Sequence, residues 1–84
     1  MPSKAPVLQP TASVVLGGLG ASIRQRRKAL RVSAGNAAEA AGMSRVTLHR
    51  IERGEASVTM GAYANAMAAL GVQIRIVDAT AGVA

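Results

Sequence analysis

Positively charged side chains are concentrated in one stretch of this 84-residue sequence. Between Ile23 and Arg53, eight Arg or Lys residues stand against two Glu residues, which accounts for the whole net charge of +6. Arginine, with its planar fork of donors, fits phosphate oxygens and the edges of bases. The stretch therefore indicates a phosphate-rich partner such as nucleic acid. Charge alone also allows a solvated basic face that binds nothing.

The acidic and nucleophilic residues are placed in a way that disfavours catalysis. The carboxylates of Glu39, Glu52, Glu55 and Asp78 are dispersed, and the single histidine, His49, has no orienting acid nearby. The chain has no Cys, and one His cannot by itself build a metal site. It also lacks the glycine-rich loops that bind dinucleotides or phosphates. We expect no enzymatic activity, no cofactor and no metal.

Helical periodicity predicts the elements that carry the basic residues. Leu19, Ile23, Arg27 and Leu30 recur at spacings of four, four and three, so they share one face of a helix. This first helix is expected to run from Gly17 or Gly18 to Arg31. Three further helices are expected, with Ser33, Ser44 and Thr59 as N-caps and Gly42, Gly54 and Gly71 at their ends.

The helix after Ser44 has an apolar side and a basic side. The two sides are Leu48, Ile51 and Glu52 against Val46, His49, Arg50 and Arg53. Glu52 is the one carboxylate on the inward side, and Arg27 is the one cation on the inner stripe of the first helix. Because a buried charge is costly unless it is paired, we expect Arg27 and Glu52 to form an ion pair. The outward side is expected to have no acidic neighbour.

Small and flexible side chains are expected to fill the remaining core. On the second helix these are Ala37, Ala38 and Ala41, which permit close approach of a neighbouring helix. The fourth helix has an inner stripe, whose predicted members are Met60, Tyr63, Ala64, Met67 and Leu70.

The two ends of the chain differ from its helical centre. Residues 1–15 are predicted to be a flexible arm, because three Pro residues stand there among small polar ones. Residues 16–71 are predicted to form the DNA-binding domain, and residues 79–84 a flexible tail. Two uncharged stretches, residues 5–23 and 56–74, are too polar to span a membrane, so we expect no membrane partner.

Residues 72–78 have the alternating pattern of a β-strand. Val72, Ile74 and Ile76 alternate with Gln73 and Arg75. A lone strand leaves its backbone groups unpaired, so we expect it to pair with its own copy across a two-fold axis. The residues predicted to form this dimer contact are Val72, Ile74, Arg75 and Ile76. Pairing with Ser13–Leu16 is the alternative.

Two runs of residues resemble a known family. They are Leu19-Gly20-x-x-Ile23-Arg24-x-x-Arg27 and Ala38-x-x-x-Gly42-Met43-Ser44-Arg45-x-Thr47-Leu48-x-Arg50-Ile51-Glu52-Arg53-Gly54. Over residues 16–72 the chain resembles the lambda-repressor/Cro-like DNA-binding domains of the xenobiotic-response-element (XRE) type. The resemblance implies an all-α helix-turn-helix bundle of four or five helices, here with one short C-terminal strand that pairs across a dimer. It also implies that the helix starting at Ser44 enters the major groove.

The same resemblance assigns roles to individual residues. The residues expected at base edges are Arg45, Val46 and Arg50, those expected near phosphates are Ser33, Ser44 and Arg53, and Thr47 and His49 could reach either. In this family the Arg27–Glu52 pair is structural. The sequence departs from the family pattern at Ala34, where Gln is frequent, at Ala37, where Leu is usual, and at Glu55, which opposes a phosphate contact.

The C-terminal residues from Ala69 to Ala79 are similar to the end of HipB-type antitoxins. This second resemblance implies a homodimer on a near-palindromic operator, and it allows a toxin bound to the same dimer. We therefore expect a sequence-specific regulator of transcription, working as a repressor on double-stranded DNA in the bacterial cytoplasm, at the nucleoid. The alternative is an antitoxin that neutralises a partner toxin and autoregulates its operon.

Overall fold

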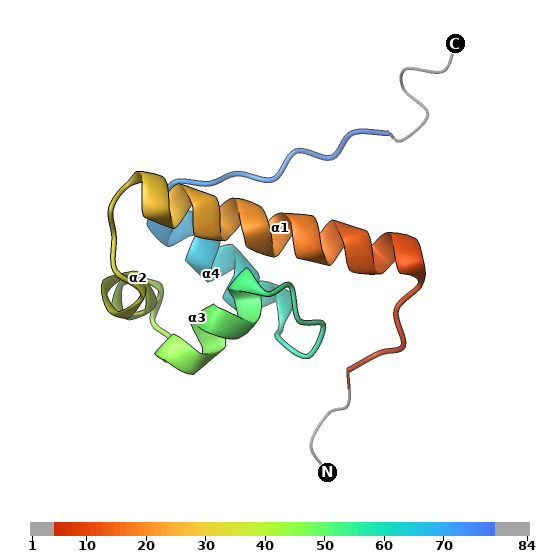
Figure 1. The fold of residues 1–84 in the computed structure, drawn as a ribbon, viewed down its shortest axis with the longest axis horizontal. Coiled ribbons are helices and arrows are strands. Elements are labelled where there is room, and N and C mark those ends of the chain that lie inside the picture. The colour runs from red at the N-terminus through yellow and green to blue at the C-terminus, as the bar shows by residue number, and fades with distance from the viewer. Residues whose placement is uncertain (1–4, 79–84) are drawn as a thin grey trace.

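The computed structural model describes residues 5–78, and these residues contain four helices (Figure 1). They are α1 (Pro10–Ala29), α2 (Ala34–Ala41), α3 (Arg45–Glu52) and α4 (Met60–Leu70). Helix α1 packs on α3 and α4, and α2 packs on the same two helices. The described residues form no strand, and the expectation of an all-α bundle is confirmed.

The predicted caps fix the ends of the shorter helices. Ser33, Ser44 and Thr59 each accept a hydrogen bond from a backbone N–H three residues later, at 3.1 Å. Gly42 and Gly71 end α2 and α4 in the left-handed region, with φ of 70° and 69°. Glycine adopts that conformation without the steric cost a Cβ would bring. These boundaries were therefore predictable from local chemistry.

The predicted start of the first helix is wrong, because α1 begins at Pro10 rather than at Gly17 or Gly18. Proline is well suited to a first turn, where its missing N–H would have no partner in the helix. Gly17 and Gly18 lie inside α1, and a helix tolerates such residues at about 1 kcal/mol each. The predicted arm is consequently helical over residues 10–15. Residues 1–4 and the predicted tail 79–84 lie outside the described residues.

Helix α1 ends in an unusual way for its sequence. Leu30 is the C-cap, and Arg31 then takes a left-handed conformation with φ 57°, the one non-glycine residue of positive φ in the described chain. The next N–H, of Val32, donates to the carbonyl of Arg27 at 3.1 Å. This geometry is the one that glycine usually supplies after a helix.

One apolar core lies between the four helices. Its largest fully buried side chains are Ile23, Leu48, Ile51 and Tyr63. The small residues predicted on α2 are buried against it, namely Ala37, Ala38 and Ala41.

Three residues predicted to be inward are exposed. Met60 is 66% exposed because it lies in the first turn of α4, and Leu30 is 44% exposed because it follows the last turn of α1. Ala64 is also exposed, and Ala66 is buried in the stripe of α4 instead.

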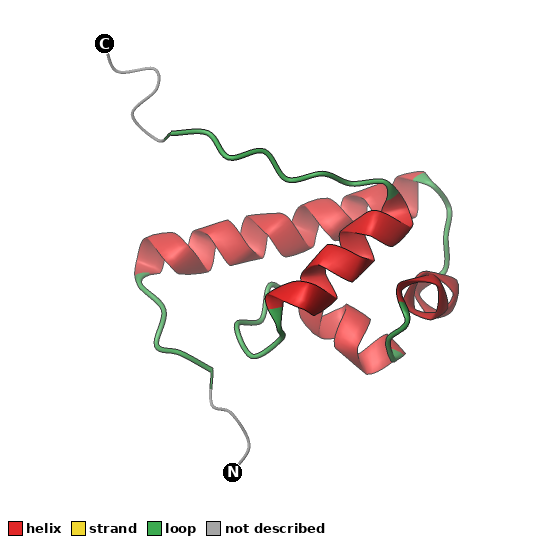
Figure 2. Ribbon diagram, turned by 180° about the vertical axis from the view of Figure 1, so that it is seen from behind, coloured by secondary structure: helices red, strands yellow, loops and turns green. Residues whose placement is uncertain are grey.

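Residues 72–78 leave the bundle as an extended segment that belongs to no helix or strand (Figure 2). The alternative pairing with Ser13–Leu16 is wrong, because those residues lie within α1. Val72 is half-buried against the core, but Ile74 is 51% and Ile76 98% exposed. Pairing with a second copy stays a prediction. Within residues 5–78, no helix is both long and apolar enough to cross a membrane.

Helix α1 crosses the end of α3 at Gly20, where the two backbones come very close. A Cβ at this position would overlap the carbonyl oxygen of Ile51 and lie 2.8 Å from that of Glu52. At Gly18, by contrast, a Cβ would meet nothing within 4 Å. Only a residue without a side chain allows α1 to approach α3 this closely.

We therefore expect Gly20→Ala to lower the free energy of unfolding by about 2 kcal/mol or more, since backbone atoms must move to admit the methyl group. Gly18→Ala is the matched control, and it should raise stability by about 0.5–1 kcal/mol because alanine favours the helix. Urea unfolding of both variants tests this. Equal effects of the two substitutions would show that α1 and α3 are not in close contact.

Candidate nucleic-acid interface

Helices α2 and α3 form two arms joined by a tight turn, and α3 lies at the surface (Figure 1). The turn holds Gly42, Met43 and Ser44. The N–H of Met43 donates to the carbonyl of Ala38 at 2.9 Å, and its side chain packs against the core. The Ser44 hydroxyl then caps α3. Both sides of the turn are thus fixed, so α3 has a defined orientation relative to α2.

The faces of α3 are divided as its periodicity predicts. Leu48, Ile51 and Glu52 are buried. The outward side chains are exposed, namely those of Arg45, Val46, His49 and Arg50, with Arg53 at the C-cap. Val46 is 63% exposed, although it is apolar. An apolar side chain among arginines on a free helix face suits a groove that offers both hydrogen-bonding edges and thymine methyl groups.

A bidentate ion pair attaches α3 to α1. Arg27 Nε donates to Glu52 Oε2 at 2.7 Å, and Arg27 Nη2 donates to Glu52 Oε1 at 3.0 Å. The third donor used, Arg27 Nη1, bonds the carbonyl of Val32 at 3.0 Å. The Arg27 side chain is 11% exposed and that of Glu52 3%. The expected pair therefore joins α1, α3 and the α1–α2 loop at a single site.

The positive charge of Arg27 is stable. The hydrogen bonds to Glu52 raise the pKa of Arg27, while desolvation lowers it and the negative charge of Glu52 raises it further. Because arginine is strongly basic even before this increase, the guanidinium stays protonated at any pH at which the protein would be studied. Titration of Arg27 will not loosen the interface.

The prediction that the outward side of α3 has no acidic neighbour is wrong. Glu55 Oε2 lies 2.6 Å from Arg53 Nη2, and Glu55 Oε1 lies 3.9 Å from Arg50 Nε. Gly54, with φ 72°, reverses the chain after α3 and returns Glu55 to its arginines. The N–H of Glu55 donates to the carbonyl of Arg50 at 3.0 Å. A left-handed glycine just before the acid was the signal that sequence reasoning missed.

The loop that carries Glu55 is held from the core side as well. The hydroxyl of Tyr63 donates to the backbone carbonyl of Glu55 at 2.8 Å. Burial, with a smaller contribution from the charge of Glu55, raises the pKa of Tyr63 above its usual 10.0. Tyr63 therefore keeps its proton at neutral pH and holds Glu55 beside Arg53.

The remaining predicted phosphate contacts lie at helix N-termini. The Ser33 hydroxyl accepts from the N–H of Asn36, and the Ser44 hydroxyl accepts from the N–H of Thr47 while donating to Thr47 Oγ1 at 3.0 Å. Both serines are exposed. The first turns of α2 and α3 thus point free N–H groups outward, which favours anions.

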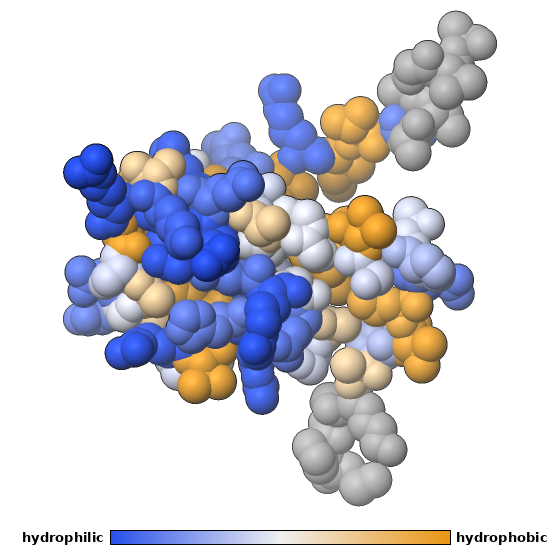
Figure 3. Space-filling model, in the orientation of Figure 1, coloured by the Kyte–Doolittle hydropathy of each residue, from blue (hydrophilic) through white to orange (hydrophobic). Residues whose placement is uncertain are grey.

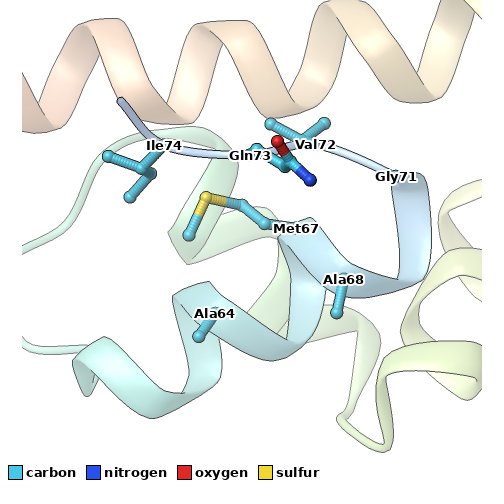
Figure 4. A pocket seen from close by; sticks show the side chains of 7 residues that line it. All are labelled: Ala64, Met67, Ala68, Gly71, Val72, Gln73 and Ile74. Carbon is cyan, nitrogen blue, oxygen red and sulfur yellow. The ribbon is translucent and has the colours of Figure 1, made fainter. Parts of the chain in front are cut away.

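Two of the residues predicted for dimerisation, Val72 and Ile74, lie away from α3 and beside α4. A groove of about 460 Å³ separates α4 from the C-terminal segment (Figure 4). Its lining residues are Ala64, Met67, Ala68, Gly71, Val72, Gln73 and Ile74. It lacks titratable side chains. Among the described residues, no three His, Cys, Asp or Glu side chains lie together as a metal site would require.

Comparison with known proteins agrees with this geometry. A family model described as "Helix-turn-helix domain" matches residues 18–79. The chain belongs to the helix-turn-helix family. The match spans most of α1 and all of α2, α3 and α4, and the family is one of DNA-binding modules whose second arm enters the major groove. A search of curated proteins gives no match.

For this helix-turn-helix protein we expect Glu52→Gln to lower the free energy of unfolding by about 3 kcal/mol, because it leaves the nearly buried Arg27 without a counter-charge. Replacing both partners, in Arg27→Met/Glu52→Leu, should cost less than Glu52→Gln alone, because no uncompensated charge remains. Chemical denaturation measures both. A double variant less stable than Glu52→Gln would contradict this and would show that the ion pair stabilises the fold more than apolar side chains in its place.

Proposed function

We propose that this protein is a sequence-specific regulator of transcription that places α3 in the major groove of double-stranded DNA. The carrying observation is the division of α3, whose buried side is fixed to α1 by the Arg27–Glu52 pair while its basic side is exposed. A helix held on a rigid base can present side chains to base edges in one register. The family match supports DNA binding as such.

Individual residues take distinct roles in this proposal. Arg45, Val46 and Arg50 read base edges, and an arginine aligned with guanine contributes about 1–3 kcal/mol of discrimination. Ser33, Ser44 and Arg53 contact phosphates, and Thr47 and His49 serve either purpose. Glu55 competes for Arg53 and Arg50 in the free protein. Because exposed pairs of this kind contribute about 1 kcal/mol or less, a phosphate can displace the carboxylate.

The active form in this proposal is a homodimer. Residues 72–78 are extended, and Ile74 and Ile76 both keep a large exposed surface, although Ile74 also lines the groove beside α4. A symmetric pairing of two such segments would bury both residues and satisfy the backbone. Two copies of α3 would then read a near-palindromic operator with half-sites about one helical turn, or a multiple of it, apart. Binding over a promoter makes repression the expected output, in the cytoplasm at the nucleoid.

An antitoxin role is the second candidate. The observation that favours it is the amount of exposed apolar surface outside α3, since Val14 is 74%, Val15 63% and Val77 73% exposed. DNA needs none of these residues, whereas a bound toxin would cover them. A kinase-like toxin gene directly downstream would favour this candidate, and its absence would favour the plain regulator.

Selection of duplexes from a random pool at near-physiological salt tests the proposed function. The protein should enrich one two-fold symmetric site, whose half-site spacing reports the dimer geometry. Arg50→Ala should bind that site about ten-fold or more weaker and lose preference at one position per half-site. Glu39→Gln, an exposed change on α2, is the control and should leave both unchanged. Enrichment of no site would contradict sequence-specific binding.

We also expect Ile74→Pro to convert dimer to monomer, because proline removes a hydrogen-bond donor from the proposed strand pair. Sedimentation across a range of protein concentration measures this. Helical circular dichroism should stay unchanged, since residue 74 lies outside the bundle. A variant that stayed dimeric would move the dimer contact to another surface, with α4 the first to examine.

A further inference from the structure

The recognition helix α3 presents less free positive charge than its sequence suggests. Arg50 and Arg53 both lie beside the carboxylate of Glu55. Among the Arg and Lys residues of α3, Arg45 is the one that is exposed and forms no ion pair with the described residues. Most of the side chains that give the net charge of +6 must therefore lie outside α3.

Most of the uncompensated charge lies on the second half of α1 and just after it. Arg24, Lys28 and Arg31 are exposed, and within residues 5–78 none of them forms an ion pair. Arg24 and Lys28 are four residues apart and so lie on one side of α1, and Arg31 follows directly after the C-cap of that helix. We name these three residues the α1 basic stripe. It spans about 10 Å along the axis, enough for about three phosphates of one DNA strand.

The α1 basic stripe lies on the α3 side of the molecule. On the opposite flank of α1, Arg26 Nε donates to the carbonyl of Leu70 in α4. Arg27, which bonds Glu52 of α3, lies about 100° from Arg26 around the axis of α1. Arg24 and Lys28 lie about 60° and 100° beyond Arg27 in the same direction. In the view of Figure 3, with α1 and α3 in front of α4, hydrophilic side chains gather over the C-terminal half of α1 and over α3. The stripe and α3 thus share one face.

The conformation of Arg31 gives an independent reason to assign the stripe a role. Arg31 occupies the left-handed position after α1, which glycine would fill with less strain. Its side chain is exposed, and among residues 5–78 it forms no ion pair or hydrogen bond that would favour arginine at this position. A strained residue with a free charged side chain is the pattern expected where the side chain serves binding. Arg31 also lies two residues before Ser33, a proposed phosphate contact.

We propose that the α1 basic stripe is a second phosphate-binding surface, which contacts the DNA backbone beside the major-groove contacts of α3. The proposal rests on DNA binding by α3 and adds a part of the interface that reads no bases. Arg24, Lys28 and Arg31 neutralise phosphates and release counterions, so they raise affinity for any sequence and steepen its dependence on salt. Base preference stays with α3.

The test compares the wild type with the triple variant Arg24→Gln/Lys28→Gln/Arg31→Gln on a mixed-sequence duplex of about three helical turns, or roughly 30 base pairs. Fluorescence anisotropy over a range of salt gives the affinity and its slope. The triple variant should bind about ten-fold or more weaker, with a slope shallower by about 2–3 in log–log units. The site enriched from a random pool should be unchanged, which separates this proposal from failure of α3 to read DNA.

Two control variants keep the outcome clear. Arg24→Lys/Arg31→Lys retains every charge and should retain the wild-type slope. Arg31→Gly should raise the melting temperature, because glycine fits the left-handed position, and yet reduce the slope by about 0.9. This variant remains informative if the triple variant folds poorly.

An unchanged slope and affinity in the triple variant and in Arg31→Gly would overturn the proposal. A labelled poly-glutamate peptide provides the remaining arm. If the triple variant lost binding to this peptide but not to the duplex, the stripe would serve an acidic protein partner, and the proposal would be wrong.

Discussion

The ion pair between Arg27 and Glu52 determines where α3 lies, and the candidate interface depends on that position. Two of its hydrogen bonds join α1 to α3, and a third joins α1 to Val32 in the loop that leads into α2. The pair is nearly buried, so its loss would leave a charge in a poorly solvated site. Such a pair fixes one register between the helices, because an alternative packing would separate the charges.

Close backbone approach acts together with the pair. Gly20 allows α1 to cross the end of α3, and Gly54 allows the chain to turn there, since a Cβ at Gly54 would lie 2.7 Å from the carbonyl carbon of Leu16. The same turn brings Glu55 to Arg53. One crossing point therefore sets both the orientation of α3 and the partial neutralisation of its arginines. The free charge is left on α1, beside the face that α3 presents.

Much of the fold could be predicted because it depends on local chemistry. Ser33, Ser44 and Thr59 cap helices through bonds to residues three positions away. The Arg27–Glu52 pair could also be foreseen, since each residue is the single charge on an inward face. Of the candidate site, the exposed face of α3 followed from the same periodicity. The roles of its residues toward DNA remain predictions.

The rest depends on tertiary geometry that spacing does not express. The start of α1 at Pro10 was missed because the first turns of α1 extend beyond the core, so these turns have no buried apolar stripe. Met60 was placed inward by periodicity, but the buried side of α4 passes through Tyr63 and Ala66 and leaves Met60 exposed. Glu55 was expected to oppose a phosphate contact, but its pairing with Arg50 and Arg53 was missed because that approach depends on a left-handed turn. Residues 72–78 need a second chain before their pairing can be observed.

The central claim is that the outward face of α3, held by the Arg27–Glu52 pair, is the surface that meets DNA. Mapping of backbone amide chemical shifts during titration with a selected duplex tests it most directly. The largest changes should fall on the amides of α3 and on the first turn of α2 near Ser33, with α4 little affected. Changes concentrated on α4 and residues 72–78, with α3 unaltered, would contradict it.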